Sequence, residues 1–358
     1  MAPSGSAESS RGYRVWVEAW RQRRVESRHR VVVAGVGTPA LPAYERDPDS
    51  LPRTSMRSTA KPFQLLPLIA AGGAERFQLD AADLALMAAS HDGTEADAAR
   101  AAAILARLGL GAEDLRCGLQ RPYFLERLPP DDPARARLYG PLHHNCSGNH
   151  AGFLALALLH GVPTARYLDA ASPSQTRAHG VVEALAGARP DVLEDDCGAP
   201  CYDLPLAAIG RCYRFLARPD AVHGLEPERR ERLQSVVELP AVVGALERIA
   251  AAMTQFPECV ASAHTGLWRL AREFPGELVV KNGAEGMLCV AWRDRGAALA
   301  LKVVDGHPRA ALPALLFLMQ EFGWLPATAA ARLREQCEPV RRGTRGQEIG
   351  QLRVCRAP

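Results

Sequence analysis

The sequence predicts an α+β fold (an α/β sandwich) in which strands from both ends of the chain form one antiparallel sheet and a helical middle region covers it. Both ends contain short apolar segments that alternate with polar residues or are rich in β-branched residues, separated by polar or glycine turns. The middle, roughly residues 58–255, is rich in alanine and leucine with helical periodicity. We therefore expect a disordered segment at residues 1–12 and one domain at 13–358, with the helical region, roughly residues 58–255, inserted into it.

The individual elements follow from the same patterns. We expect strands at residues 13–20, 30–34, 277–281, 287–292, 297–304 and 349–355. We expect helices after residue 58 and at 81–89, 94–108, 151–160, 174–186, 204–216, 227–253 and 310–322. The proline-rich stretch 38–57 is predicted to be an irregular loop.

The overall composition excludes several classes of function. The net charge is +3 and the arginines are dispersed, so neither nucleic acid nor an anionic membrane is an expected partner. No apolar stretch reaches the roughly 18 residues of a membrane helix, and the first residues show no secretory signal. The nine cysteines are an odd number in a chain long enough to fold without disulfides, which predicts reduced thiols and a cytoplasmic location.

Two lysines stand in positions suited to activating a serine. Ser58 and Lys61 form a Ser-x-x-Lys motif, and residues three apart share one face of a helix. A neutral lysine can act as the base that a serine nucleophile needs. Lys281 ends an apolar strand in Lys-Asn-Gly, close to the Lys-Thr-Gly of penicillin-recognising enzymes, in which such a strand lies beside the Ser-x-x-Lys helix. Two lysines in one pocket would also lower each other's pKa.

Two further segments are candidates for the site. Ser90 and His91 follow an apolar helix directly, where Ser90 is either an ordinary helix-terminal residue or a second hydroxyl near Lys281. Residues 143–150 contain three histidines and a cysteine, but their spacing fits no structural zinc pattern. Gly148 and Asn149, at the start of the next helix, are expected to bind substrate or to cap the helix.

Five ordered motifs make the chain similar to a known family, the Rhizobium-type L-asparaginases, also called the asparaginase II or class 3 family. They read RSTAKPFQ at 57–64, ASH at 89–91, NCSG at 145–148, DCGAP at 196–200 and KNGAEG at 281–286. The resemblance extends from about residue 25 to residue 354, which is nearly the whole chain.

The resemblance implies a fold like that of serine β-lactamases and glutaminases, a homodimer, and hydrolysis of L-asparagine to L-aspartate and ammonia. It implies two catalytic pairs, Ser58 with Lys61 and Ser90 with Lys281. It also implies that the charged ends of the amino acid are bound by Arg57, His91 and Asp195.

One position departs from the family pattern. The family motif reads Asn-Cys-Ser-Gly-Lys-His, and its lysine joins two cysteines in holding zinc beside the active site. Cys146 and Cys197 correspond to the cysteines, but Asn149 stands at the lysine position. Because a neutral amide is a poor zinc ligand, we expect no required cofactor and at most weak zinc binding at the two cysteines.

We therefore expect an amidohydrolase that acts on a small amino-acid amide. In the working hypothesis Ser58 attacks the amide with Lys61 as base, while Ser90 and Lys281 relay protons to the leaving ammonia. The sequence leaves open which serine is acylated. It also leaves open a glutaminase or β-lactamase-like esterase, and an amino-acid-binding protein without activity.

Overall fold

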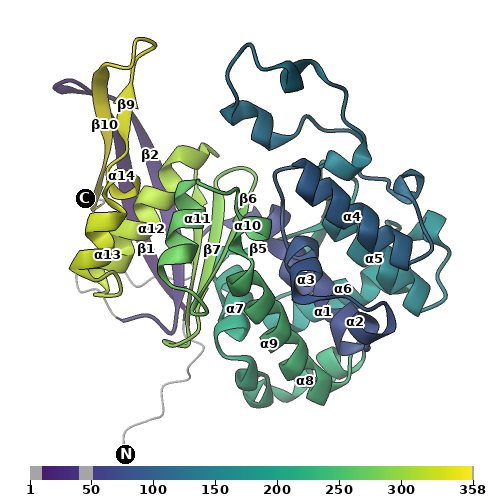
Figure 1. Ribbon diagram of the computed structural model, residues 1–358. Coiled ribbons are helices and arrows are strands. Elements are labelled where there is room, and N and C mark those ends of the chain that lie inside the picture. Colours follow the sequence, from purple (N-terminus) through teal and green to yellow (C-terminus); the bar gives the residue numbers. More distant parts are fainter. Residues whose placement is uncertain (1–9, 40–50, 357–358) are drawn as a thin grey trace, which may run out of the picture.

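A seven-stranded antiparallel sheet forms one side of the molecule, and a helical body forms the other (Figure 1). The computed structural model describes residues 10–39 and 51–356. In spatial order the strands of the sheet are β6 (Leu278–Gly283), β7 (Met287–Trp292), β8 (Ala297–Val303), β2 (Arg24–Val36), β1 (Ser10–Arg21), β10 (Glu348–Arg356) and β9 (Val340–Arg342).

The sheet joins the two ends of the chain. β1 and β2 form a hairpin, β1 pairs with β10, and β2 pairs with β8. This arrangement confirms the predicted α+β class, with strands from both termini in one antiparallel sheet. Most of the segment predicted to be disordered, residues 1–12, and much of the predicted loop 38–57 lie outside the described residues; β1 already begins at Ser10.

Helices cover both faces of the sheet. α7 (Leu206–Ala217) packs on one face against β2, β7 and β8, and α12 (Ala311–Glu321) packs on the other. One core cluster joins the α7 face to the helical body, and a second joins the opposite face to α12 and α11 (Gly266–Glu273). Every residue of β7 is buried because the strand lies between these two layers.

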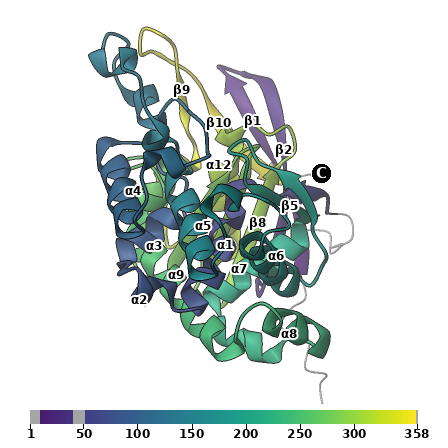
Figure 2. The same cartoon turned by 90° about the vertical axis from the view of Figure 1, so that its right-hand side faces the viewer.

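The helical body surrounds α5 (Ser147–Leu159), which is buried along most of its length. A helix that is apolar on all sides is expected at the centre of a domain. Its other helices are α1 (Lys61–Ala70), α2 (Gly73–Arg76), α3 (Ala81–Met87), α4 (Glu95–Arg107), α6 (Pro173–Ala186), α8 (Pro227–Gln234), α9 (Leu239–Gln255) and α10 (Pro257–Val260). Figure 2 shows α1, α5, α6, α7 and α9 grouped in this body, and the last two helices, α13 (Ala327–Arg332) and α14 (Arg334–Cys337), lie near α12.

The structure differs from the predicted elements in several places, of which three bear on the site. The single helix expected at 227–253 is divided into α8 and α9, and Pro240 in the first turn of α9 suits the start of a new helix. The helix expected from residue 204 begins at Leu206, because Leu204 and Pro205 pair with β3. A small sheet of β3 (Arg53–Ser55), β5 (Pro200–Pro205) and β4 (Asp191–Glu194) was not expected.

Within the described ranges, no helix has both the length and the apolar character needed to cross a membrane.

The contact between α5 and α3 gives a test of the packing. A Cβ added to Gly148 would lie 2.6 Å from the backbone oxygen of Leu86, whereas one added to Gly152, one turn later, would meet only side chains at 3.7 Å. Gly148→Ala is therefore expected to lower the free energy of unfolding by about 1–3 kcal/mol. The control Gly152→Ala should leave it unchanged or raise it by up to about 1 kcal/mol, since alanine favours the helix. Urea unfolding measures both, and equal effects would contradict the close packing.

Candidate active site

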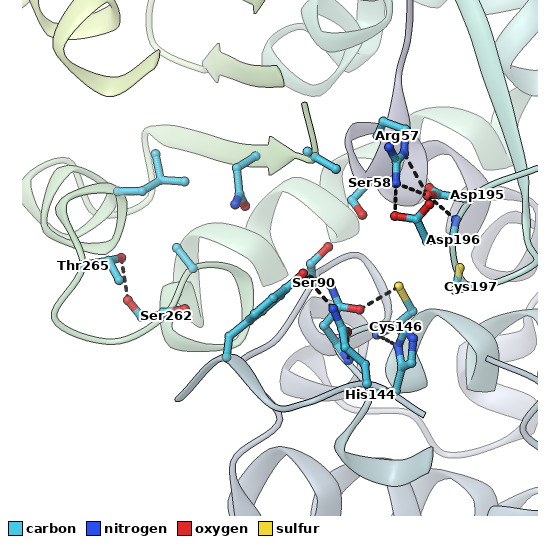
Figure 3. Close-up of a pocket in the computed structure, with 18 of the residues that line it drawn as sticks. Arg57, Ser58, Ser90, His144, Cys146, Asp195, Asp196, Cys197, Ser262 and Thr265 are labelled. Carbon is cyan, nitrogen blue, oxygen red and sulfur yellow. Dashed lines mark hydrogen bonds and ion pairs between the residues drawn. The ribbon is translucent and has the colours of Figure 1, made fainter. Parts of the chain in front are cut away.

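A pocket of about 430 Å³ lies where the helical body meets the end of β6 (Figure 3). This volume is in the range of small-molecule sites. Polar side chains dominate its lining, which comes from segments far apart in the sequence. The residues are Arg57, Ser58, Ser90, Leu119, Gln120, Tyr123, His144, Asn145, Cys146, Asp195, Asp196, Cys197, Ala261, Ser262, Thr265, Leu267, Asn282, Gly283 and Ala284.

Ser58 reaches the pocket from a short 3-10 helix, η2 (Arg57–Ala60), that leads into α1. The residue before it, Arg57, has φ = 47°, a left-handed conformation that is uncommon for a residue other than glycine. Such local strain is concentrated at functional sites. Gly283, at the end of β6, packs closely here, since a Cβ on it would lie 3.2 Å from the backbone oxygen of Met56.

Ser90 lies between two lysine amines. Lys61 Nζ donates a hydrogen bond to Ser90 Oγ at 3.0 Å, and Lys281 Nζ donates one at 3.1 Å. The expected contact of Lys281 with Ser90 is therefore present. Among the hydrogen bonds of the described residues, none joins Ser58 to Lys61, although their spacing suggested it. The two lysines converge on the second serine of the predicted set rather than one on each.

Lys281 is fully buried, and its amine also donates to the backbone oxygen of Asn282 at 2.6 Å. Burial lowers the pKa of Lys281 well below the usual value for lysine, and the positive charge of Lys61 lowers it further. An amine with a lowered pKa is the form of lysine that can accept a proton from a hydroxyl near neutral pH.

Charged side chains occupy the far side of the pocket from Ser262 and Thr265 (Figure 3). Arg57 Nε donates to Asp195 Oδ1 at 2.8 Å, and its Nη2 donates to Asp196 Oδ2 at 2.5 Å. One cation and two carboxylates side by side can pair with the carboxylate and the ammonium group of an amino acid. Arg57 and Asp195 were expected in this role; Asp196, directly before the Cys-Gly motif, was not chosen from the sequence.

Cys146 and Cys197 also line the pocket, but their surroundings do not fit a zinc ion. Lys61 Nζ donates to Cys146 Sγ at 3.1 Å, so a cationic group already occupies the space beside the thiol. A hydrogen bond from Cys197 lowers the pKa of Cys146 well below its usual value, with Lys61 and His144 adding to the effect against burial. Over the described ranges, no group of three or more histidine, cysteine or acidic side chains could hold a metal.

The predicted substrate contacts at Gly148 and Asn149 are buried in α5, and the pocket lining does not include them. Asn149 Nδ2 points to Gln64 Oε1 at 3.4 Å, and Gln64 Nε2 donates to the backbone oxygen of Pro200 at 2.9 Å. This arrangement links α5, α1 and β5 and favours a structural use of the amide.

His91 is also buried, behind the pocket wall. Its Nε2 lies 2.9 Å from Ser147 Oγ, and its Nδ1 accepts from the backbone N–H of Gly93 at 3.1 Å. Burial, and then the charge of Lys61, lower its pKa to about 3, so the ring is neutral. A neutral ring with a hydrogen-bond partner at each nitrogen can keep the loop that carries Ser90 in place.

Several lining residues carry no recognisable motif and were missed in the sequence. Gln120 and Tyr123 come from the irregular segment after α4, and Ser262 and Thr265 come from the turn before α11. Gln120 Nε2 donates to Tyr123 OH at 2.9 Å, and Asn145 Nδ2 donates to the same oxygen at 3.3 Å. Only the fold shows that these loops reach Ser90.

Comparison with known proteins agrees with this site. The family model for L-asparaginase II matches residues 17–354, which is nearly the entire chain. A search of curated proteins finds no significant match. Because this match covers nearly the whole chain, the chain belongs to the L-asparaginase II family.

Proposed function

We propose that this protein hydrolyses the side-chain amide of L-asparagine to give L-aspartate and ammonia. The observation that carries the proposal is the position of Ser90 Oγ, 3.0 Å from Lys61 Nζ and 3.1 Å from Lys281 Nζ in a polar pocket. Membership of the asparaginase II family supports an amide as the substrate. We also propose, from the family resemblance, the serine β-lactamase-like topology and a homodimer.

In the proposed reaction Lys281 acts as the general base. Its amine, whose pKa is lowered by burial, accepts the Ser90 hydroxyl proton, and Ser90 Oγ attacks the amide carbon. The C–N bond then breaks as the leaving nitrogen takes up the proton that Lys281 received and departs as ammonia, which leaves an acyl-enzyme and a neutral Lys281. Water, activated by the same amine, hydrolyses the ester and releases aspartate. This assignment moves the nucleophile from Ser58, the working hypothesis from the sequence, to Ser90.

The other groups bind the substrate. Arg57 faces the α-carboxylate, and Asp195 with Asp196 faces the α-ammonium group. Ser58, which lines the same pocket as Ser90, lies where it can hydrogen-bond the reacting amide. Backbone N–H groups at the end of β6, near Gly283, are candidates for holding the oxyanion.

Purified protein is expected to release ammonia from L-asparagine faster than from L-glutamine, and Ser90→Ala should reduce the rate by at least about 10³-fold, as loss of a nucleophile does in other hydrolases. A coupled ammonia assay measures both. Asparagine binding by the wild-type protein without ammonia release would instead identify an amino-acid-binding protein, and faster release from glutamine would identify a glutaminase.

Mass spectrometry of the protein during turnover of a slow ester analogue of asparagine locates the acyl group. We expect it on Ser90. An acyl group on Ser58 would restore the first serine as the nucleophile.

Substitution of Lys281 tests the proposed base. Lys281→Arg should abolish turnover, because a guanidinium keeps its proton near neutral pH. The matched control is Lys302→Arg, since the Lys302 amine binds the backbone oxygen of Glu285 instead of a serine. In the wild type, kcat/KM should rise with pH as Lys281 loses its proton, with a midpoint below the value of about 10.4 for a free lysine. An active Lys281→Arg enzyme, or a flat pH profile, would contradict the assignment of the base.

The zinc content of the protein gives a further test. We propose that the protein purified without added metal contains little zinc, because Asn149 supplies no suitable donor and Lys61 lies beside Cys146. Asn149→Lys should raise the zinc content, and Asn149→Gln, which keeps an amide, should not. Metal analysis under reducing conditions measures all three proteins. One zinc per chain in the wild type would show that another residue completes the site.

A further inference from the structure

Two loops that line the pocket are attached to a single buried carboxylate, that of Asp92, two residues after Ser90. The Asp92 side chain is 7% exposed and accepts hydrogen bonds from Arg127 and from Ser262 Oγ. We propose that Asp92 is a positioning residue that fixes both loops at the distance the substrate requires. This inference depends on the proposed function only for the identity of the substrate that the pocket binds.

The first loop is the segment after α4 that contains Gln120 and Tyr123. It is built from turns and the short helix η4 (Tyr123–Arg127), so little regular structure holds it in place. Arg127, at the end of η4, forms an ion pair with Asp92 through Nη2, and its Nη1 lies 3.4 Å from the other carboxylate oxygen. The backbone N–H of Phe124 donates to the backbone oxygen of Asp92 at 3.3 Å. Asp92 therefore binds this loop through both its side chain and its backbone.

The second loop is the turn between α10 and α11. Ser262 Oγ donates to Asp92 Oδ1, while Ser262 O accepts from the Thr265 backbone N–H at 3.1 Å and from Thr265 Oγ1 at 2.6 Å. Thr265 is also the N-cap of α11. The contact with Asp92 thus fixes the position of Thr265, which faces the pocket.

The second loop lies on the side of the pocket away from the charged group, and the first loop lines the same pocket through Gln120 and Tyr123. In Figure 3, Ser262 and Thr265 lie across Ser90 from Arg57 and Asp195. If Arg57 and Asp195 hold the charged end of the substrate, the Asp92-bound loops close on the amide end. A small displacement of either loop would loosen substrate binding without moving the Ser90 hydroxyl, which the two lysines hold separately.

The geometry next to Asp92 leaves it little freedom to move. Gly93 has φ = 74°, and a Cβ there would lie 2.2 Å from the backbone oxygen of His143. His91, on the other side, is held by Ser147. The carboxylate therefore projects from a fixed backbone, and the two loops are the parts that adapt to it.

Steady-state kinetics and amide hydrogen exchange of the full-length protein test the proposal. Arg127→Gln, Ser262→Ala and Asp92→Asn should each raise KM for asparagine by about tenfold with kcat changed by less than about threefold. Arg127→Lys, which keeps the ion pair, should restore much of the KM. Peptides spanning residues 119–127 and 262–267 should exchange about tenfold faster in the variants. In an Asp92→Asn background, Arg127→Gln should raise the KM for asparagine by less than a further twofold. Both substitutions act through one carboxylate, so their effects are not additive.

Arg137→Gln is the matched control. Arg137 lies on the same loop and pairs with Glu95 at 3.1 Å, but both side chains are largely exposed and neither lines the pocket. The Arg137→Gln variant should have the same KM for asparagine and the same amide hydrogen exchange rates as the wild type. Unchanged KM and exchange in Arg127→Gln and Ser262→Ala would overturn the proposal, as would an Asp92→Asn enzyme that loses kcat alone. If the wild type does not hydrolyse asparagine, the proposed function fails, and the exchange data still decide whether Asp92 holds the loops.

Discussion

The site depends on two lysine amines that lie within 3.1 Å of one serine hydroxyl. Two ammonium groups this close, largely removed from water, would repel each other and lose their hydration. The arrangement is stable when one of them is neutral, and Lys281, fully buried in β6, is the one whose pKa burial lowers. The same burial that makes the site costly to build lowers the pKa of Lys281, which supports the role of base proposed for it.

The sheet is what brings these groups together. Lys281 lies on an edge strand supplied by the second half of the chain, and Lys61 lies at the start of α1, more than 200 residues earlier. The end of β6 packs on the backbone before η2 at Gly283, where a Cβ would find backbone oxygen at 3.2 Å. The close approach favours a glycine, since any Cβ there would require a shift of a few tenths of an ångström. Catalytic geometry therefore depends on long-range packing as much as on the residues themselves.

The sequence was sufficient for the fold class and for several residues that lie in or beside the pocket, but not for the contacts between them. Alternation at residues 13–20, apolar runs separated by turns at both ends, and helical periodicity between them predicted the sheet and the helical body. Ser58 and Lys61 were expected to meet because they are three residues apart, yet Lys61 turns to Ser90 and Cys146. Their short-range spacing did not reveal this tertiary contact. Asp92 and its two loops were missed for the same reason, since their partners lie 35 and 170 residues away.

The choice between lysine and arginine along the chain gives separate support for the proposed lysine base. The chain has 43 lysines and arginines, of which only Lys61, Lys281 and Lys302 are lysines. Across the described residues, the positive partner of each ion pair is an arginine or a histidine. Lysine is therefore not the residue that this chain uses for ion pairs. Arginine keeps its proton in proteins, whereas lysine can lose it when buried. Two of the three lysines contact one serine, which supports the proposed role of an amine that exchanges a proton, a role that a guanidinium of equal charge could not fill.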